Sequence, residues 1–276
     1  MELTIFDRAV LRLVDPEEPM EKLATGYVFC EGPVYRDGVH HFTDFQVNKI
    51  YRYQDGKAEC VNDDSYFTIG LTYDRVRGRI LGCTREKHAI TNIETGEIIV
   101  DQYNGVRLNG SNDVIVDSKG RIYFSDPLSR KIEGEQIGHS SVFRYTPETG
   151  EMDSLETTLT YPNGLALSPD EKTLYIVDTN SIAVYSLDLA NGSFKLFAQL
   201  EESLGEGRPD GMRVDIKGNL YVTGPAGIWI LAPDSKALGV IHTPERAANL
   251  CFDDTGLFIT ATSSVYHVRT KVPSAC

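Results

Sequence analysis

NDVIVDSKGRIYF, at residues 112–124, returns in altered form as DGMRVDIKGNLYV at residues 210–222. In both stretches an Asp follows the first residue by five positions and a Gly by eight, and a β-branched or aromatic triplet comes next. Asp and Gly favour a tight turn, and the runs on either side of it favour strands. Each stretch is therefore predicted to form a β-hairpin.

Looser copies of this pattern run along the whole chain. We call the first residue of each copy its marker, and the six markers are Glu31, Gly70, Asn112, Asn163, Asp210 and Asn249. Successive markers are 39, 42, 51, 47 and 39 residues apart. A period of about 40 to 50 residues is typical of propeller blades, and a closed ring of blades buries both faces of each sheet. The sequence therefore predicts an all-β, six-bladed β-propeller.

The ends of the chain bear on how the ring closes. The last copy, from Asn249 to about Val272, is too short for four strands, so we expect the N-terminal run Leu3 to Val14 to complete the last blade. No Pro/Ser-rich or charged linker divides the chain, and residues 1–276 are predicted to form a single domain. Short helical pieces are expected around residues 16–22 and 200–204.

Charge and composition narrow the class of partner. The formal net charge of −13 disfavours binding to nucleic acid and to anionic membranes. The N-terminus has no basic region followed by an apolar core, and no apolar run approaches the ~20 residues that span a bilayer. We expect a cytoplasmic protein, a monomer or a weak homo-oligomer. Five cysteines without close paired spacing favour reduced thiols over a disulfide framework.

Four of the markers carry side-chain oxygens. In a radial arrangement Glu31, Asn112, Asn163 and Asp210 converge on one axis, which predicts a metal site. Oxygen ligands favour a hard divalent cation, Ca²⁺ first, with Mg²⁺, Mn²⁺ and Fe²⁺ as alternatives; Zn²⁺ more often recruits His or Cys. Two carboxylates neutralise the ion, and the two amides add no charge, so the ion stays electrophilic and can polarise a carbonyl.

Each of these residues also has a purely structural interpretation. Asn163-Gly164 and Asp210-Gly211 are ordinary turn dipeptides, and Glu31 before Gly-Pro can be a strand-entry residue. Four oxygen side chains at equivalent repeat positions favour the site over these separate explanations. Four further acids are expected to be structural: Asp117 and Asp215 as turn residues, and Asp126 and Asp178 near the channel.

Longer motifs resemble a known family. The stretches FCEGPVY at residues 29–35, SNDV at 111–114, YPNGLALSPDE at 161–171 and PDGMRVD at 209–215 are similar to the gluconolactonase and regucalcin (senescence marker protein, SMP-30) family, in its bacterial gluconolactonase-like branch. The resemblance covers nearly the whole chain. It implies a six-bladed propeller with one catalytic divalent ion in the central channel.

The resemblance also implies roles for single residues. The Glu of EGP, the Asn of PNG and the Asp of PDG, here Glu31, Asn163 and Asp210, are the expected metal ligands. Asn112 of the ND motif lies close to the metal in this family and is a fourth candidate ligand. Asp210 is also the expected general base, so Asp210 and Asn112 are the predicted catalytic residues.

These observations lead to an expected function and its alternatives. The expected activity is metal-dependent opening of a small-molecule lactone to the hydroxy acid, with a water activated by Asp210 or by the ion. Sugar lactonases of the family carry an Arg two residues before the ND motif, where this chain has Gly110, so a differently hydroxylated or hydrophobic lactone is left open. Ring specificity is expected to come from the loops Asp126 to His139 and Glu201 to Arg208.

Other chemistries are compatible with the same residues. Phosphotriester or fluorophosphate hydrolysis on the same scaffold and a non-enzymatic Ca²⁺-binding propeller are the two alternatives. The chain contains no serine-nucleophile elbow and no phosphate loop, so neither covalent serine catalysis nor an organic cofactor is expected.

Overall fold

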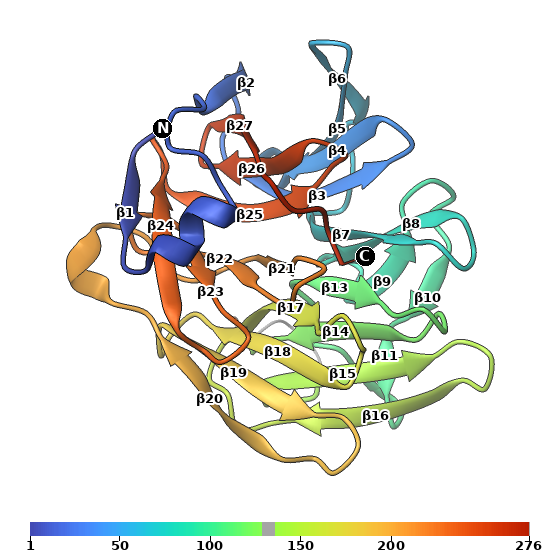
Figure 1. Ribbon diagram of the computed structural model, residues 1–276. Helices are drawn as coiled ribbons and strands as arrows, with labels where there is room; N and C mark the ends of the chain where they lie inside the picture. Colours follow the sequence, from blue (N-terminus) through green and yellow to red (C-terminus); the bar gives the residue numbers. More distant parts are fainter. Residues whose placement is uncertain (129–135, 276) are drawn as a thin grey trace.

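The computed structural model describes residues 1–128 and 136–275. Six antiparallel sheets are arranged radially around one axis, like the blades of a propeller (Figure 1). The prediction of an all-β, six-bladed propeller is confirmed. Consecutive strands pair with one another within each blade, except that two N-terminal strands pair with the outer edges of the last two blades.

The strands of the six blades, numbered here from the first marker, have the following bounds. Blade 1 contains β3 (Cys30–Arg36), β4 (Val39–Asp44), β5 (Lys49–Gln54) and β6 (Lys57–Asn62); blade 2 contains β7 (Thr68–Asp74), β8 (Arg79–Thr84), β9 (Ala89–Asn92) and β10 (Ile98–Val100). Blade 3 contains β13 (Val114–Val116), β14 (Ile122–Asp126), β15 (Ser141–Thr146) and β16 (Glu151–Glu156); blade 4 contains β17 (Pro162–Leu167), β18 (Thr173–Asp178), β19 (Ala183–Asp188) and β20 (Phe194–Gln199).

The remaining elements complete the ring. Blade 5 contains β21 (Met212–Val214), β22 (Leu220–Gly224), β23 (Gly227–Leu231), β24 (Ala237–His242) and the N-terminal β1 (Leu3–Ile5); blade 6 contains β25 (Ala247–Phe252), β26 (Gly256–Ala261), β27 (Ser264–Arg269) and β2 (Glu21–Thr25). A small hairpin, β11 (Gln102–Tyr103) and β12 (Val106–Arg107), connects blades 2 and 3.

The first strand of each blade lies innermost. Backbone hydrogen bonds link neighbouring inner strands directly: Gly70 N–H donates to Asn112 O (3.0 Å), Gly164 N–H to Asp210 O (2.8 Å) and Gly211 N–H to Ala248 O (2.8 Å). The inner strands also contact one another in order around the ring, from β3 through β7, β13, β17 and β21 to β25 and back to β3. The markers are therefore gathered around the central channel.

The hydrophobic core is divided among the interfaces between blades. Six clusters of buried side chains fill the six interfaces, one cluster to each. Alternation along a strand explains this division, because successive side chains point to opposite faces of a sheet. In β14, Ile122 and Phe124 pack against blade 2, whereas Tyr123 packs against blade 4. The hydrophobic triplet of the repeat thus contributes side chains to the interfaces on both sides of its blade.

An N-terminal strand closes the last blade, but it is not the expected segment. The closing strand is β2, whose Lys22 pairs with Tyr266 of β27 (Figure 1). The prediction that Leu3 to Val14 would do this is wrong: β1 adds a fifth strand to the edge of blade 5, and a 3₁₀ helix, η1 (Arg8–Arg12), follows. Asp7 accepts a hydrogen bond from Ala9 N–H (2.7 Å) and so ends the strand by capping this helix.

The short helices also differ in part from expectation. Residues 16–22 form turns and the start of β2, so the helix predicted there is wrong. The helix expected at residues 200–204 is present only as a single 3₁₀ turn, η3 (Glu202–Leu204), and a similar turn, η2 (Phe45–Val47), follows β4. In the described part of the chain, no helix is long and apolar enough to cross a membrane. Cys30, Cys60, Cys83 and Cys251 are free thiols.

A carboxylate ties blade 6 to blade 1 across the closure. Asp253, in the turn after β25, lies 3.1 Å from Nε2 of His40 on β4 and 3.1 Å from Nε2 of His267 on β27. Its other oxygen accepts from the backbone N–H of Thr255 (2.7 Å) and Gly256 (2.8 Å). Burial opposes ionisation, but the hydrogen bonds from His267, His40 and Thr255 outweigh it and hold the pKa of Asp253 well below its usual range.

Asp253→Asn is expected to lower the free energy of unfolding by about 2–3 kcal/mol at pH 7, because two histidines and two backbone donors lose a charged acceptor. Since the folded-state pKa is depressed, this stabilisation is complete above the unfolded value of 3.8 and declines as the pH falls below it. Urea titrations from pH 7 to pH 3 measure the difference in the free energy of unfolding between wild type and variant, which we call the gap. The exposed Asp63→Asn serves as control, and a gap that stays constant down to pH 3 contradicts the assignment.

Candidate metal centre

The four oxygen-bearing markers lie at the start of the inner strands. Glu31 lies in β3 and Asn163 in β17, while Asn112 and Asp210 each precede their strand by two residues. All four side chains are buried, with exposed fractions of 3 % for Glu31, 8 % for Asn112, 4 % for Asn163 and 7 % for Asp210. The other two markers, Gly70 and Asn249, occupy the same position in β7 and β25.

The pairing of the inner strand with its neighbour is irregular at the marker. The register shifts between Glu31 and Val34 in blade 1 and between Pro162 and Leu165 in blade 4. Blades 2 and 6 show the same shift at their own markers. A bulge changes the direction of a side chain relative to a regular strand. Because of this irregularity, the marker side chains do not follow the regular alternation of side-chain directions along the inner strand.

The glycine after a marker is required by close packing. A Cβ on Gly164 would lie 2.2 Å from Asp210 O, and one on Gly211 would lie 2.0 Å from Asn249 Oδ1. Neither glycine has a positive φ. The interpretation of Asn163-Gly164 as an ordinary turn dipeptide is therefore wrong: Gly164 lies within β17 and allows β21 to approach. Contact between inner strands brings the segments that carry Asn163, Asp210 and Asn249 close together.

The acids that were expected to be structural are so in the structure. Asp126 accepts hydrogen bonds from Asn109 N–H (2.9 Å) and Gly110 N–H (3.0 Å), and Asp178 accepts one from Tyr161 N–H (2.8 Å). Each carboxylate thus holds the loop that leads into a marker. Asp117 and Asp215 lie in the hairpin turns, as predicted, where Arg121 N–H and Asn219 N–H donate to their side chains (2.9 and 3.0 Å).

Glu31 and Asp210 are two buried carboxylates that act on each other. The pKa of Glu31 is raised well above 4.5, first by burial and then by the charge of Asp210, against hydrogen bonds from Gly32 N–H and Asn249. Burial raises the pKa of Asp210 to about 7, the charge of Arg246 lowers it, and Asp113 raises it again. The centre of the channel is therefore a site where negative charge is concentrated and poorly solvated.

The hydrogen bonds of Asn163 show which of its atoms is available. Its Nδ2 donates to Thr179 Oγ1 (3.0 Å), and the Thr179 hydroxyl donates to Pro209 O (2.8 Å). Because the single hydroxyl proton is used on Pro209, Thr179 must accept from Asn163, which fixes the orientation of the amide. The amide of Asn163 also lowers the pKa of Asp210 through a hydrogen bond, and its Oδ1 is left as an acceptor.

Asn112 lies beside an aromatic residue that the sequence analysis did not select. A hydrogen bond from Asn112 lowers the pKa of Tyr161, which burial raises above its usual value. Tyr161 also experiences the charges of Asp210 and Glu31, and Asn163 forms a hydrogen bond with Asp210, so the four predicted residues belong to one electrostatic neighbourhood. The only signal for Tyr161 in the sequence is its place two residues before Asn163.

Asn249 orients Glu31 rather than facing the axis as an acceptor. Its Oδ1 accepts from Leu250 N–H (2.9 Å), so its Nδ2 is directed to Glu31 Oε2 at 3.1 Å. Gly32 N–H donates to the same oxygen at 2.8 Å, and both hydrogen bonds thus end on Oε2. The sixth copy of the repeat therefore supplies a positioning residue, which its marker position could have indicated.

Two further charged residues at the centre were missed. Arg246 Nη2 lies 3.9 Å from Asp210 Oδ2. Asp113, beside Asn112, accepts from Leu165 N–H (3.0 Å) through Oδ2, while its buried Oδ1 has no hydrogen-bond partner in the described part of the chain. Asp113 is part of the quoted ND motif, but no pattern in the sequence distinguishes Arg246 from other surface arginines.

Gly110 lies next to an arginine from another blade. A Cβ on Gly110 would lie 3.8 Å from Arg85 Nε, so the side chain of Arg85, in the turn after β8, reaches this position. The charge of Arg85 also lowers the pKa of Tyr161, which burial raises. A guanidinium is thus present near the channel mouth although the sequence has no Arg at position 110. Of the predicted specificity loop 126–139, residues 129–135 lie outside the described residues.

The donor set fits a divalent cation bound through oxygen. Two buried carboxylates of like charge, an amide oxygen left free by its hydrogen bonds and an unpartnered buried oxygen of Asp113 all favour a cation between them. In the described ranges no three His, Cys, Asp or Glu side chains are grouped closely enough to hold a metal ion on their own. A cation bound here would therefore need oxygens from other groups as well, and the amides of Asn112 and Asn163 are the candidates among the markers.

A consequence of this electrostatics is measurable in metal-free protein. With chelator at pH 7.5, Asp210→Asn is expected to raise the free energy of unfolding by about 1–3 kcal/mol, because it removes one of two buried like charges that Arg246 offsets only in part. With saturating Ca²⁺ wild type is expected to be the more stable of the two. Thermal unfolding under both conditions tests this; Asp126→Asn, which loses backbone hydrogen bonds, should destabilise under both. A variant that is less stable without metal contradicts the prediction.

Comparison with known proteins agrees with the fold and the motifs. Residues 29–263 match the model of the SMP-30/gluconolactonase/LRE-like region. The chain is 32 % identical to a gluconolactonase from Zymomonas mobilis, with 98 % of this chain and 86 % of the relative covered, and 26 % identical to a pentonolactonase from Haloferax volcanii, with 83 % and 80 % covered. It superimposes on a gluconolactonase structure from Xanthomonas campestris with a TM-score of 0.90 at 28 % identity, covering 98 % and 95 % of the two chains. This protein is a member of the SMP-30/gluconolactonase family.

Proposed function

We propose that this protein is a metal-dependent lactonase that opens small lactones to their hydroxy acids. The observation that carries the proposal is the pair of buried, mutually repelling carboxylates Glu31 and Asp210, set beside two amides at the centre of the channel. Family membership and the lactonase relatives support the reaction class.

The metal would be held by Glu31, Asn163 and Asp210, with Asn112 as a fourth oxygen donor. Ca²⁺ is the cation we expect, with Mg²⁺, Mn²⁺, Fe²⁺ and Zn²⁺ as alternatives. When bound, the cation supplies Lewis-acid polarisation of the lactone carbonyl. Asn249 and Gly32 N–H hold Glu31 in one orientation, and Thr179 holds Asn163.

The remaining steps belong to the side chains. Asp210 takes a proton from the attacking water, and Asn112 orients the substrate carbonyl. Water attack on the carbonyl carbon gives a tetrahedral adduct, and its collapse breaks the ring C–O bond. The proton that Asp210 took from the water then passes to the released alkoxide, so that a hydroxy acid is formed and the carboxylate is regenerated. Arg246, 3.9 Å from Asp210, favours the ionised form of this base.

The channel mouth favours a polar lactone. Arg85, Arg246 and Tyr161 bring two guanidiniums and one hydroxyl to the site, and groups of this kind bind sugar hydroxyls better than alkyl chains. Arg85 compensates in part for the missing Arg at position 110. We therefore place aldonolactones first among the substrates.

A lactone panel tests the proposal. Glucono-δ-lactone, γ-butyrolactone and dihydrocoumarin are incubated with the protein, and acid release is followed with a pH indicator. We expect acidification that chelator abolishes and divalent cation restores, fastest with the sugar lactone. Tight Ca²⁺ binding without turnover on the whole panel favours a non-enzymatic Ca²⁺-binding protein, whereas turnover of fluorophosphates alone favours a phosphotriesterase; both results contradict the lactonase.

A further inference from the structure

A cavity lies at the opposite end of the inner strands from the candidate metal centre. The markers stand at the beginning of the inner strands, whereas this cavity of about 470 Å³ is lined by their ends, including Val116 of β13, Leu167 of β17 and Val214 of β21. Ser274 and Ala275 of the C-terminal segment line it too, and Ala275 N–H donates to Val214 O (3.0 Å). A volume of this size suits a small organic molecule.

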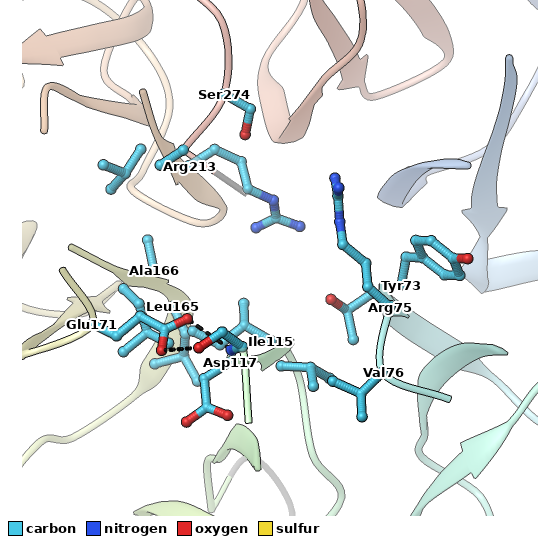
Figure 2. A pocket seen from close by; sticks show the side chains of 16 residues that line it. Tyr73, Arg75, Val76, Ile115, Asp117, Leu165, Ala166, Glu171, Arg213 and Ser274 are labelled. Carbon is cyan, nitrogen blue, oxygen red and sulfur yellow. Dashed lines mark hydrogen bonds between the residues drawn. The ribbon is translucent and has the colours of Figure 1, made fainter. Parts of the chain in front are cut away.

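Two arginines reach into this cavity (Figure 2). Arg75 comes from the turn after β7 and Arg213 from β21. In residues 1–128 and 136–275, Arg75 makes neither a hydrogen bond nor an ion pair within the chain. Arg213 donates to Met212 O (2.7 Å) and lies 3.7 Å from Asp113 Oδ2, so its guanidinium is only partly compensated.

The acids of the same cavity already have partners. Asp117 forms an ion pair with Arg121 (2.6 Å), and Glu171 accepts from both the N–H and the hydroxyl of Ser118 (2.7 Å each). Figure 2 shows Asp117 and Glu171 on a different side of the cavity from the two guanidiniums. The chain has a net charge of −13, yet the guanidinium groups of Arg75 and Arg213 are available to bind an anionic ligand in this cavity.

The rest of the wall is apolar. Val76, Ile115, Leu165 and Val214 line the cavity beside the arginines. Guanidinium groups bind carboxylates through paired, charge-assisted hydrogen bonds, and apolar walls favour an apolar ligand body.

We propose that this cavity binds a small monocarboxylate with an apolar body. The carboxylate lies between Arg75 and Arg213, and the aliphatic or aryl part packs on the Val, Ile and Leu side chains. The site is separate from the metal centre and does not depend on the activity proposed above. Its ligand binds without chemical change.

Calorimetric titration with a homologous series of carboxylates tests the proposal. Butyrate, hexanoate and octanoate are titrated into the metal-loaded protein and again with chelator, because a carboxylate could otherwise bind a cation in the channel. We expect the same binding in both conditions, tightening about threefold to fourfold for each added methylene until the cavity is full. Hexanamide, which lacks the charge, is expected to bind at least about tenfold more weakly than hexanoate.

Arg75→Gln provides the matched variant. Arg75 is exposed and has no hydrogen-bond or ion-pair partner in the described ranges, so its replacement should leave folding and lactone turnover unchanged. The affinity for hexanoate should fall by about tenfold or more. Arg8→Gln removes the same charge at an exposed position outside the cavity and should have no effect on binding. Any of the following results overturns the proposal: binding lost with chelator, equal affinity for hexanoate and hexanamide, or unchanged hexanoate affinity in Arg75→Gln. Competition between hexanoate and the lactone substrate also overturns it, since it places the carboxylate at the metal centre.

Discussion

Asp210→Asn is expected to lower kcat/KM for lactone hydrolysis by at least about 1,000-fold, because it removes a metal ligand's charge and the proposed base at once. The substitution preserves shape, and the amide can still offer an oxygen to the cation. Asp210 N–H donates to Thr223 Oγ1 (2.9 Å), so the backbone that carries the side chain is held independently of the carboxylate. The substitution is therefore expected to change the charge and basicity of the side chain without moving the backbone that carries it.

The two roles of Asp210 can be separated by metal titration. Calorimetry is expected to show about 10- to 100-fold weaker metal affinity in Asp210→Asn, since one of two carboxylate ligands is lost. At saturating metal the activity is expected to stay low, because the base is still absent. Full recovery of kcat at high metal would mean that Asp210 holds the ion and does no more. Asp253→Asn, which changes an acid in the turn after β25, is the control and should retain kcat.

Gly164→Ala is expected to lower the free energy of unfolding by about 3–5 kcal/mol and to weaken metal binding at the same time. The added Cβ would lie 2.2 Å from Asp210 O and 2.9 Å from Gly211 Cα, and both of these atoms belong to the backbone, which cannot rotate away. The inner strands of blades 4 and 5 must separate, and the hydrogen bond from Gly164 N–H to Asp210 O is strained. Asn163 and Asp210 then move apart.

Chemical unfolding and calorimetric metal titration of the same preparation measure both effects. Gly96→Ala is the control: Gly96 has a positive φ of 76° but open space around its Cβ, so alanine there should cost only about 1 kcal/mol and leave metal affinity unchanged. Equal destabilisation by the two variants would show that close approach of the inner strands is not what Gly164 provides.

The ring itself could be predicted because its signal is repeated. Each blade carries a turn between two hydrophobic runs, and the same period along the chain predicts the same unit six times. The closing strand was harder to identify. Leu3 to Val14 is apolar enough to form a strand, but Asp7 caps a 3₁₀ helix, and the edge strand that closes the ring, β2, is a short polar segment whose pairing is decided by β27.

The residues of the candidate metal centre could be predicted from their repeat positions, but the residues that surround them could not. Tyr161 could have been found from its place before Asn163, and Asn249 from its marker position. Arg246 approaches Asp210 from the loop before β25, and Arg85 reaches Gly110 from the turn of a different blade. Contacts of this kind join residues far apart in the chain, so no local pattern in a single sequence predicts them.

Local hydrophobic period and turn chemistry are enough to predict the number of blades, the alternation that fills their interfaces and the identity of the oxygen-bearing markers. Only the folded ring shows that glycines after the markers permit contact between inner strands, that burial and the charge of Asp210 raise the pKa of Glu31, and that Arg75 and Arg213 line one cavity. Distance and burial set the strength of electrostatic interactions, and both exist only once the ring has closed.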